Sequence, residues 1–546
     1  MIRRPIPIAF QAIVLATALI VTSWAGTVFA DDRPDLVVAV NKLPSGLEPH
    51  DKTGNVDVRV THTVFDTLIR RDFTRQDQYG ANPLIPSLAT SWKRINPTTL
   101  ELQLRKGVKF HDGAEFTADD VLWTFDEKRH RGKDSIIPKG NEYFGHLASV
   151  EKINDYAVRF TTNEPDAVLE QRLATYGSWI VSKKAWFDVK AKVEKENAGK
   201  PAGKQQDWMQ AALKAQYWNP VGTGPYKFDS WKKNQFIKLV AHDSYFLGKP
   251  TAKTITYKEV PEMAGRIAGL VSGEFQIIVD VTPDQIGVLE GYKDIDVRSV
   301  VLENSNVFLF NTAHPQLKDK RLRQALSLAI DRKKLVDSLW RGLNYTPKGL
   351  QIPAYGEMFI KDRKGYLYDP EKAKKLVAES GYDGKEISLR MIPDYYQNGL
   401  EAAQIAQEMW RKVGINVKLE MVESFKAVRD KKVPPAIYIW SNSYRFPDPA
   451  GAIIILWGPD VAVQKSYKYW QAPKVFNDAA NVVLTSADMA ERRKAFETML
   501  DSIEDDMPMT ILYNPLASYG VSKKVEWMPY PLFYMDFRPD ILKFRK

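Results

Sequence analysis

One stretch of this chain constrains its fold more than any other, the run from Leu100 to Phe125. Apolar residues at alternate positions of 100–104 predict a half-buried strand, and the alternation resumes at 108–110. The tripeptide 111–113, His-Asp-Gly, predicts a turn, because glycine permits the positive φ that such turns need. Thr117 then predicts a helix N-cap, with two aspartates in the first turn, where the helix dipole favours negative charge.

A second motif spans residues 219–226, Asn-Pro-Val-Gly-Thr-Gly-Pro-Tyr. Two glycines and two prolines in so short a stretch predict a fixed, turn-rich path between strands. The motif lacks the spacing of a phosphate-binding P-loop and its Lys-Ser/Thr pair, so it does not indicate nucleotide binding.

The first thirty residues are typical of a secretory signal. Arg3 and Arg4 precede an apolar core at 12–21, and Val-Phe-Ala at 28–30 fits a cleavage site. Polar residues interrupt the core, so a membrane anchor, which needs about 20 apolar residues, is the weaker alternative. A twin-arginine signal is disfavoured by the Pro-Ile-Pro that follows Arg4. We expect a mature chain that begins at Asp31.

The composition excludes several classes of protein. The chain has no cysteine, so its stability must come from core burial, and it has no thiol for lipid attachment. The length predicts two or three domains. The formal net charge is +10, but the charges are interspersed and clusters such as Lys431-Lys432 are short. This pattern indicates a solvated surface rather than a nucleic-acid interface, and it favours anionic ligands only weakly.

The second half of the chain alternates strands and helices. An apolar strand, a helix and another strand follow one another at βαβ spacing, which implies parallel pairing and a right-handed crossover. We expect strands at 307–311, 387–391, 415–421 and 437–440, and helices at 319–343, 370–381 and 402–413.

The order of these motifs resembles bacterial extracellular solute-binding proteins of family 5, the oligopeptide, dipeptide and nickel receptors of ABC importers. Shorter stretches at 47–50, 64–68 and 86–92 also resemble elements of that family. One departure is Glu48, which stands where the family has an aspartate before Pro-His.

This resemblance implies an α/β protein with the class II periplasmic-binding-protein fold, three lobes, and a ligand cleft between lobes one and three. It implies a monomer that delivers its ligand to an inner-membrane ABC permease, without a cofactor. The absence of cysteine points to a free periplasmic protein of a Gram-negative cell. The expected boundaries are 31–55, 216–302 and 505–546 for lobe one, 56–215 for lobe two, and 303–504 for lobe three.

Catalytic motifs do not emerge from the residues. The seven histidines do not show zinc-ligand spacing on a common helix, and no serine lies in a G-x-S-x-G motif. Acidic pairs such as Asp119-Asp120 and Asp505-Asp506 are explained by helix capping or solvation. We therefore expect no catalytic residue, no metal site and no enzyme activity.

A binding site is predicted just after the apolar strand 437–440, because open α/β sheets bind ligands at the carboxyl ends of their strands. The segment offers an aromatic plate, hydroxyl and amide groups, and one guanidinium. Weaker candidates are Trp457, Tyr395 and Tyr396. The predicted ligand-binding residues are Trp440, Asn442, Ser443, Tyr444, Arg445 and Asp448.

The ligand class is less well determined. In related peptide receptors this segment supplies an aspartate for the peptide ammonium, but Ser443 stands three residues after Trp440. An unpaired buried ammonium costs several kcal/mol. Arg445 and the hydroxyls instead favour an oligosaccharide, a phosphosugar or a carboxylated, opine-like ligand. A peptide ligand remains an alternative if Asp448 binds the ammonium group or if Arg445 faces solvent. Two other functions also remain as alternatives, a peptide-holding chaperone and a secreted glycan hydrolase.

Overall fold

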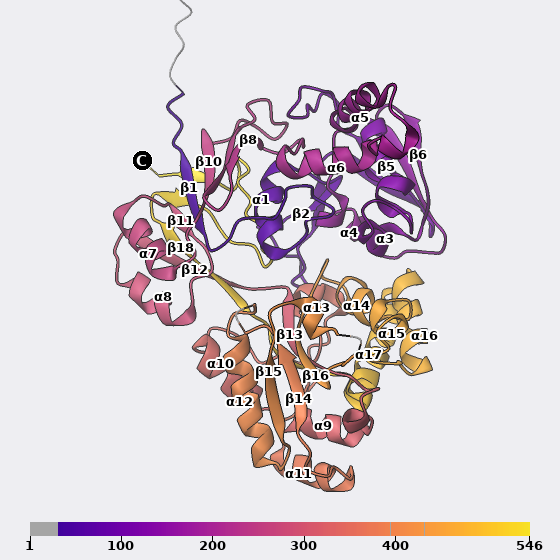
Figure 1. Cartoon of the computed structure of the whole chain (residues 1–546), viewed down its shortest axis with the longest axis vertical. Helices are drawn as coiled ribbons and strands as arrows, with labels where there is room; N and C mark the ends of the chain where they lie inside the picture. The colour runs from indigo at the N-terminus through magenta and orange to yellow at the C-terminus, as the bar shows by residue number, and fades with distance from the viewer. Residues whose placement is uncertain (1–30, 394, 431, 546) are drawn as a thin grey trace, which may run out of the picture.

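The computed structural model describes residues 31–393, 395–430 and 432–545, so the predicted signal peptide at 1–30 lies outside the described residues. The chain forms an α/β structure with three larger sheets (Figure 1). Among the described residues, none of the helices combines the length and the apolar character needed to span a bilayer.

A seven-stranded sheet is built from distant parts of the chain, and we call it, with its helices, the first body. Strand β1 lies inside the sheet and pairs in parallel with both β10 and β11. Helix α7 (Met263–Ser272) ends at Gly273, which takes the left-handed conformation. In spatial order the strands are β12 (Ile295–Val301), β18 (Leu516–Ser522), β11 (Ile277–Ile278), β1 (Leu36–Val40), β10 (Thr254–Glu259), β9 (Phe236–Ala241) and β8 (Tyr226–Lys232), with α8 (Pro283–Glu290) beside them.

A four-stranded antiparallel sheet and its helices form the second body. The predicted strand at 100–104 is confirmed as β5, and Thr117 caps α2 as predicted, with its side chain accepting from the Asp119 amide. The expected second strand at 108–110 is reduced to one isolated bridge between Lys109 and Glu115. The strands are β4 (Ala89–Asn96), β5 (Thr99–Leu104), β7 (Ala157–Thr162) and β6 (Leu147–Asn154); the helices are α2 (Ala118–Thr124), α3 (Lys139–Phe144), α4 (Leu169–Arg172), α5 (Lys183–Asn197) and α6 (Trp208–Trp218). Helix α1 (Asn55–Val64) and the hairpin β2 (Ile69–Arg71)–β3 (Leu84–Pro86) lie between β1 and this sheet in the chain.

A five-stranded mixed sheet and its helices form the third body. The predicted βαβ unit is confirmed, because β14 and β15 pair in parallel across α12. The single helix expected at 319–343 is instead two helices, since the Asp331 carboxylate caps a new helix by accepting from the Lys334 amide at 3.0 Å. The strands are β15 (Val417–Met421), β14 (Ile387–Met391), β16 (Ile437–Ser443), β13 (Asn304–Phe310) and β17 (Met509–Tyr513). The helices are α9 (Lys320–Leu328), α10 (Arg332–Trp340), α11 (Pro370–Glu379), α12 (Gly399–Lys412), α13 (Phe425–Val428), α14 (Ile455–Trp457), α15 (Ala462–Lys465), α16 (Lys474–Thr485) and α17 (Met489–Asp506).

Two chain segments cross between the first and third bodies. One leads from β12 into β13, and the other returns from β17 into β18 (Figure 1). The Leu302 amide donates to the Pro515 carbonyl at 2.9 Å, which holds the two crossings together. Because β17 pairs with β13, residues 509–513 belong to the sheet of the third body. The chain therefore returns after Tyr513, not at 505 as the expected boundary has it; the other lobe limits remain predictions.

The two motifs recognised in the sequence meet at His111. Its backbone amide donates to the Gly222 carbonyl at 3.0 Å. Its ring accepts from the Gly222 amide at Nδ1 (3.3 Å), so the neutral ring carries its proton on Nε2, which lies 3.0 Å from the Gly224 carbonyl. The Gly224 amide in turn donates to the Val64 carbonyl at 2.9 Å. These hydrogen bonds join the second body to the segment that leads into strand β8 of the first body.

We predict that Gly224→Ala strongly destabilises the fold. A Cβ at this position would lie 2.5 Å from the Val64 carbonyl carbon, a rigid backbone atom. The free energy of unfolding should fall by about 2–3 kcal/mol in a urea titration. Gly203→Ala is the matched control, because its Cβ meets no atom within 4 Å and should change stability by less than about 0.5 kcal/mol. Equal effects of the two variants would contradict this account.

We also predict that His111 makes the free energy of unfolding depend on pH. Burial lowers the pKa of His111 to about 3. Below pH ~6.5 the unfolded chain binds a proton on His111 that the folded chain excludes. The contribution of His111 to the free energy of unfolding therefore decreases by about 1.4 kcal/mol per pH unit as the pH falls from 6.5. His111→Gln, whose amide can both donate and accept, should reduce the slope of unfolding free energy between pH 6.5 and 4.5 by that amount. An unchanged slope would show that His111 does not titrate on unfolding.

Candidate functional site

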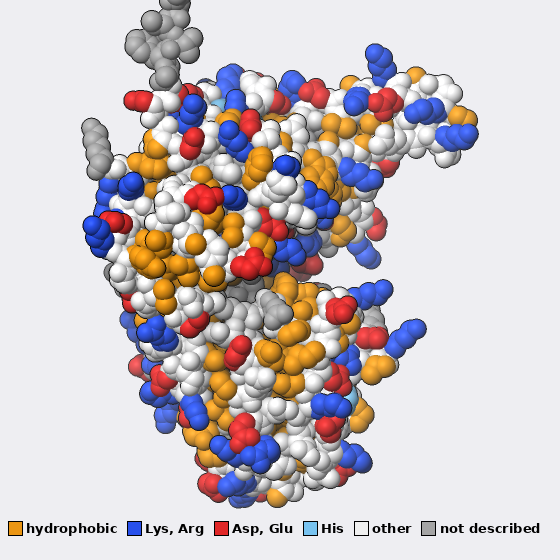
Figure 2. Space-filling model, turned by 60° about the vertical axis from the view of Figure 1, so that its left-hand side comes forward, with side chains coloured by type: hydrophobic (Ala, Val, Ile, Leu, Met, Phe, Trp, Pro, Cys, Tyr) orange, Lys and Arg blue, Asp and Glu red, His pale blue; other side chains and the backbone are white. Residues whose placement is uncertain are grey.

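A small cavity lies where the three bodies meet. Its volume is about 30 Å³, which leaves room for about one water molecule. Figure 2 shows the surface hollowed between the upper and lower parts of the molecule. The residues that line the cavity are Thr53, Asn55, Val58, Tyr176, Leu302, Glu303, Asn304, Ser443, Tyr444, Pro531, Leu532, Phe533 and Tyr534.

Two of the six predicted ligand-binding residues line this cavity. Strand β16 continues to Ser443, so residues 440–443 lie inside the strand rather than after it. Trp440 pairs with Val307 and packs on one core, whereas Ser443 pairs with Asn304 on the opposite side of the pleat. The predicted cluster is therefore divided: Ser443 and Tyr444 contact the cavity, and the other four residues are not part of its lining.

Asn442 and Asp448 serve the interior of the third body. The fully buried Asn442 donates from Nδ2 to the Ala452 carbonyl at 2.9 Å and accepts from Trp457 Nε1 at 2.7 Å. Asp448 accepts from Arg492 Nη2 with both oxygens, at 2.9 and 2.8 Å, and both side chains are 4% exposed. Asp448 is thus already neutralised and does not present a free carboxylate to an ammonium group.

Arg445 points from the third body into the second. Its Nη1 donates to the Tyr176 hydroxyl, and its guanidinium lies 5.4 and 5.6 Å from the ring centroids of Tyr143 and Tyr176. The Arg445 carbonyl accepts from the Thr175 hydroxyl at 2.9 Å. The buried Arg445 Nε finds no hydrogen-bond acceptor in the described part of the chain. Arg445 therefore bridges two bodies, a position that the sequence did not predict.

Trp440 belongs to an aromatic cluster on the third body. The ring is half-buried, and the Arg429 guanidinium stacks 4.3 Å from a ring centroid of Trp440. The weaker candidate Tyr395 is 54% exposed and packs edge-on against Phe425. Partial burial and then the Asp57 carboxylate raise the pKa of Tyr395.

Glu303 is the acidic residue of the cavity, and it is neutralised by a partner from the hairpin β2–β3. Arg71 donates to both of its carboxylate oxygens, at 2.8 and 2.6 Å, and the side chains are 6% and 2% exposed. The Glu303 amide donates to the Pro531 carbonyl at 2.7 Å. Sequence reasoning missed Glu303 and the run 531–534, because neither lies in a periodic or motif-bearing segment.

The cavity wall is consequently polar but uncharged on the side of the third body. Ser443 Oγ lies 3.0 Å from Ser441 Oγ, which donates to Asn304 Oδ1 at 2.7 Å. The Tyr444 hydroxyl lies 2.6 Å from Ser305 Oγ. Within the described residues, no group of three or more histidine, cysteine, aspartate or glutamate side chains is placed to hold a metal ion. The wall offers hydrogen bonds and aromatic surface.

A cavity enclosed by separate bodies that are joined by two crossing strands is the arrangement of a protein that binds a solute. The sequence profile "Bacterial extracellular solute-binding proteins, family 5 Middle" matches residues 83–462. The chain belongs to this family of solute-binding receptors, as its sequence motifs predicted.

Individual relatives agree with this assignment. The chain is 29% identical over 469 residues to the oligopeptide-binding protein AppA of Bacillus subtilis, covering 81% of this chain and 80% of the relative. It is 28% identical over 470 residues to the dipeptide-binding protein of Escherichia coli, covering 82% and 84%. The structure of Helicobacter pylori DppA in complex with the peptide STSA matches with a TM-score of 0.78 at 23% identity, covering 94% of this chain and 99% of that one. This match confirms the predicted fold class.

We predict that neighbouring residues of β16 respond differently to substitution. Asn442→Ala leaves Trp457 Nε1 buried without its acceptor and removes the bond to the Ala452 carbonyl, so it should lower the free energy of unfolding by about 2–3 kcal/mol. Ser443→Ala removes one hydroxyl contact at a half-buried position and should cost less than about 1 kcal/mol. Chemical denaturation measures both, and a larger loss for Ser443→Ala would refute the assignment of the two faces.

Proposed function

We propose that this chain is the periplasmic receptor of an ABC importer and that it captures a small peptide or peptide-like solute and delivers it to the permease. Membership of the family and relatives named as oligopeptide- and dipeptide-binding proteins support this function. The observation that carries the proposal is the cavity at the junction of the bodies, with aromatic residues 533–534 on one side and Ser443 and Tyr444 on the other.

Capture requires the bodies to move. Pockets for small molecules have volumes of roughly 300–1,000 Å³, far above the 30 Å³ of this cavity. The first and third bodies must therefore separate at the crossing strands to admit a solute. Groups on both sides would then contact the solute, and the closed state would be favoured in proportion to those additional contacts.

A specific observation favours a second candidate, a solute without an ammonium group. The acidic residue that lines the cavity, Glu303, already pairs with Arg71, and Asp448, in the interior of the third body, pairs with Arg492. A buried peptide ammonium would lack an anion there. The hydroxyl and amide groups of Ser443 and Asn304 would instead suit an uncharged polar solute such as an oligosaccharide, one of the ligand classes that the sequence favours.

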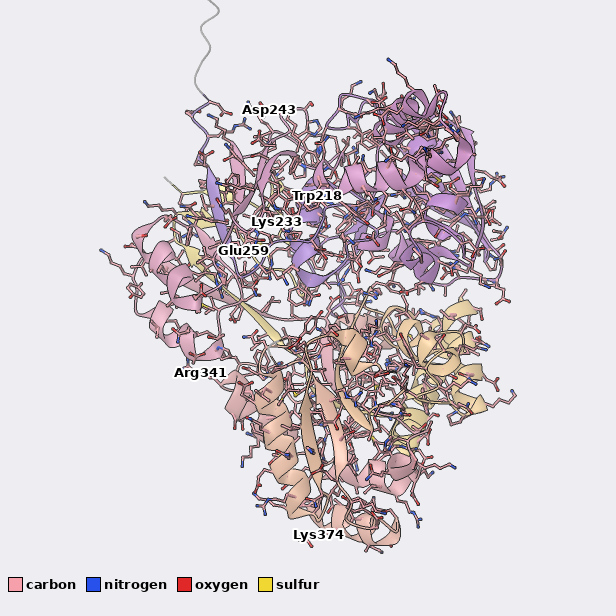
Figure 3. All side chains as sticks on the ribbon, in the orientation of Figure 1. Trp218, Lys233, Asp243, Glu259, Arg341 and Lys374 are labelled. Atoms are coloured by element: carbon pink, nitrogen blue, oxygen red, sulfur yellow. The ribbon has the colours of Figure 1, made fainter. Side chains whose placement is uncertain are left out.

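Native mass spectrometry of protein purified from the periplasm tests the proposal. We expect a retained peptide series, because tight receptors keep their cargo. Calorimetry with that cargo should show a tenfold or greater loss of affinity for Ser443→Ala. Lys374→Ala is the control, since Lys374 lies at the far tip of the third body (Figure 3).

The remaining outcomes separate the alternatives. Retention of sugar or opine-like molecules would support the second candidate, a solute without an ammonium group, instead of a peptide. Weak binding of many unrelated peptides would indicate a chaperone, and product formed from an oligosaccharide would indicate a hydrolase. Each of these three results contradicts the peptide-receptor proposal.

A further inference from the structure

The second body is attached to the third without a covalent link of its own. The chain leaves the first body after β1, forms the second body and re-enters the first at β8. Both crossings to the third body, β12 to β13 and β17 to β18, start or end in the first body, and the cysteine-free chain adds no disulfide. A motion that separates the first body from the third therefore carries the second body along and breaks its contacts with the third.

One set of these contacts lies beside helix α4. The Ala167 amide donates to the Leu484 carbonyl at 2.9 Å, which joins the two backbones. Val168 is 1% exposed and is buried in the core of the third body. The Arg172 guanidinium lies 5.6 Å from the ring centroid of Phe446. Figure 1 shows the second body lying above the part of the third body that contains α14 and α15.

A second set of contacts joins Thr175 and Tyr176 of the second body to Arg445 of the third, and we call these three residues the latch. The backbone of Arg445 is fixed within the third body, because its amide donates to the Gly451 carbonyl at 2.9 Å. The Arg445 carbonyl accepts from the Thr175 hydroxyl at 2.9 Å, and Nη1 donates to the Tyr176 hydroxyl. Tyr176 lines the small cavity, but Thr175 and Arg445 are not part of its lining.

The latch is strong enough to bias an equilibrium and weak enough to be reversible. One hydrogen bond changes an equilibrium constant by about fivefold. A guanidinium near an aromatic ring, as Arg445 is to Tyr176 at 5.6 Å, adds about twofold to fivefold. Thr175 and Tyr176 are 3% and 7% exposed, so competing water is largely excluded. Loss of the Arg445 side chain should therefore change the ratio of closed to open molecules by about tenfold.

We propose that Arg445 is a positioning residue that sets, from outside the cargo cavity, how often the receptor is closed. It holds the second body on the third through Thr175 and Tyr176, whether or not a solute is present. The latch adds to the contacts that a solute makes on both sides of the small cavity, so a weaker latch lowers the affinity for cargo wherever the open form predominates. This consequence for affinity rests on the proposed function, whereas the effect on closure does not.

Hydrogen–deuterium exchange of the cargo-free mature chain tests the latch, with the Ala167 amide as the reporter. That amide loses its partner, the Leu484 carbonyl, when the two bodies part, so its exchange rate follows the fraction of open molecules. Arg445→Leu removes the guanidinium and should accelerate this exchange about tenfold. Thr175→Val removes one hydroxyl donor and should accelerate it about fivefold.

The controls separate opening from a general loss of stability. The amides of β5, which lies between β4 and β7 in the second-body sheet, should exchange at the wild-type rate in both latch variants. Arg105→Leu is the matched control, because the Arg105 guanidinium lies 5.2 Å from the ring centroid of Phe246 and joins the second body to the first instead of the third. It should leave the exchange of Ala167 unchanged. Arg445→Lys keeps a cationic donor and should restore part of the protection.

Three results would overturn the proposal. The Ala167 amide could exchange at the wild-type rate in both latch variants, Arg105→Leu could accelerate it equally, or the amides of β5 could accelerate by the same factor as Ala167. Every measurement is made without cargo, so none of these results bears on which solute the small cavity captures. Conversely, a retained sugar would defeat the peptide-receptor proposal and leave the latch in place.

Discussion

The paired crossing between the first and third bodies is the constraint on which the rest of the structure depends. Two antiparallel segments carry the whole covalent connection, and Asn514 ties them by donating from Nδ2 to the Asn304 carbonyl at 2.6 Å and to Ser305 Oγ at 3.0 Å. A two-stranded connection permits bending but resists sliding, because its hydrogen bonds fix the register. The cavity lies directly beside this connection, because Leu302, Glu303 and Asn304 line it.

Ion pairing explains why the cavity is polar without being charged. Glu303 and Asp448 are buried, yet each is held by an arginine that comes from elsewhere in the fold. Burial of a carboxylate is tolerated only with such a partner and complementary hydrogen bonds. The pairing assigns the acids to holding segments together, and the third-body wall of the cavity presents hydroxyl, amide and aromatic groups. Arg445 has a related role between the second and third bodies, where two tyrosine rings replace an anion.

Local chemistry made much of the fold predictable. The alternation at 100–104, the cap at Thr117 and the βαβ spacing of the second half act over short distances, and the corresponding elements formed. The break at Asp331 was missed because the apolar stripe continues through it, although an aspartate is a good helix cap. The site was only half predictable: the end of β16 depends on pairing with Asn304, and Tyr176 and the run 531–534 come from segments far apart in sequence.

The alternation along β16 also bears on how receptors of this kind diverge. Positions 440 and 442 are held by the core, whereas 441 and 443 meet the hydroxyl and amide groups near the cavity. If the small cavity takes the solute as proposed, a replacement at Ser443 would change the groups that this wall offers while the packing beneath it is preserved. Two neighbouring positions of one strand would then be under separate constraints, one set by the interior and one by the cargo.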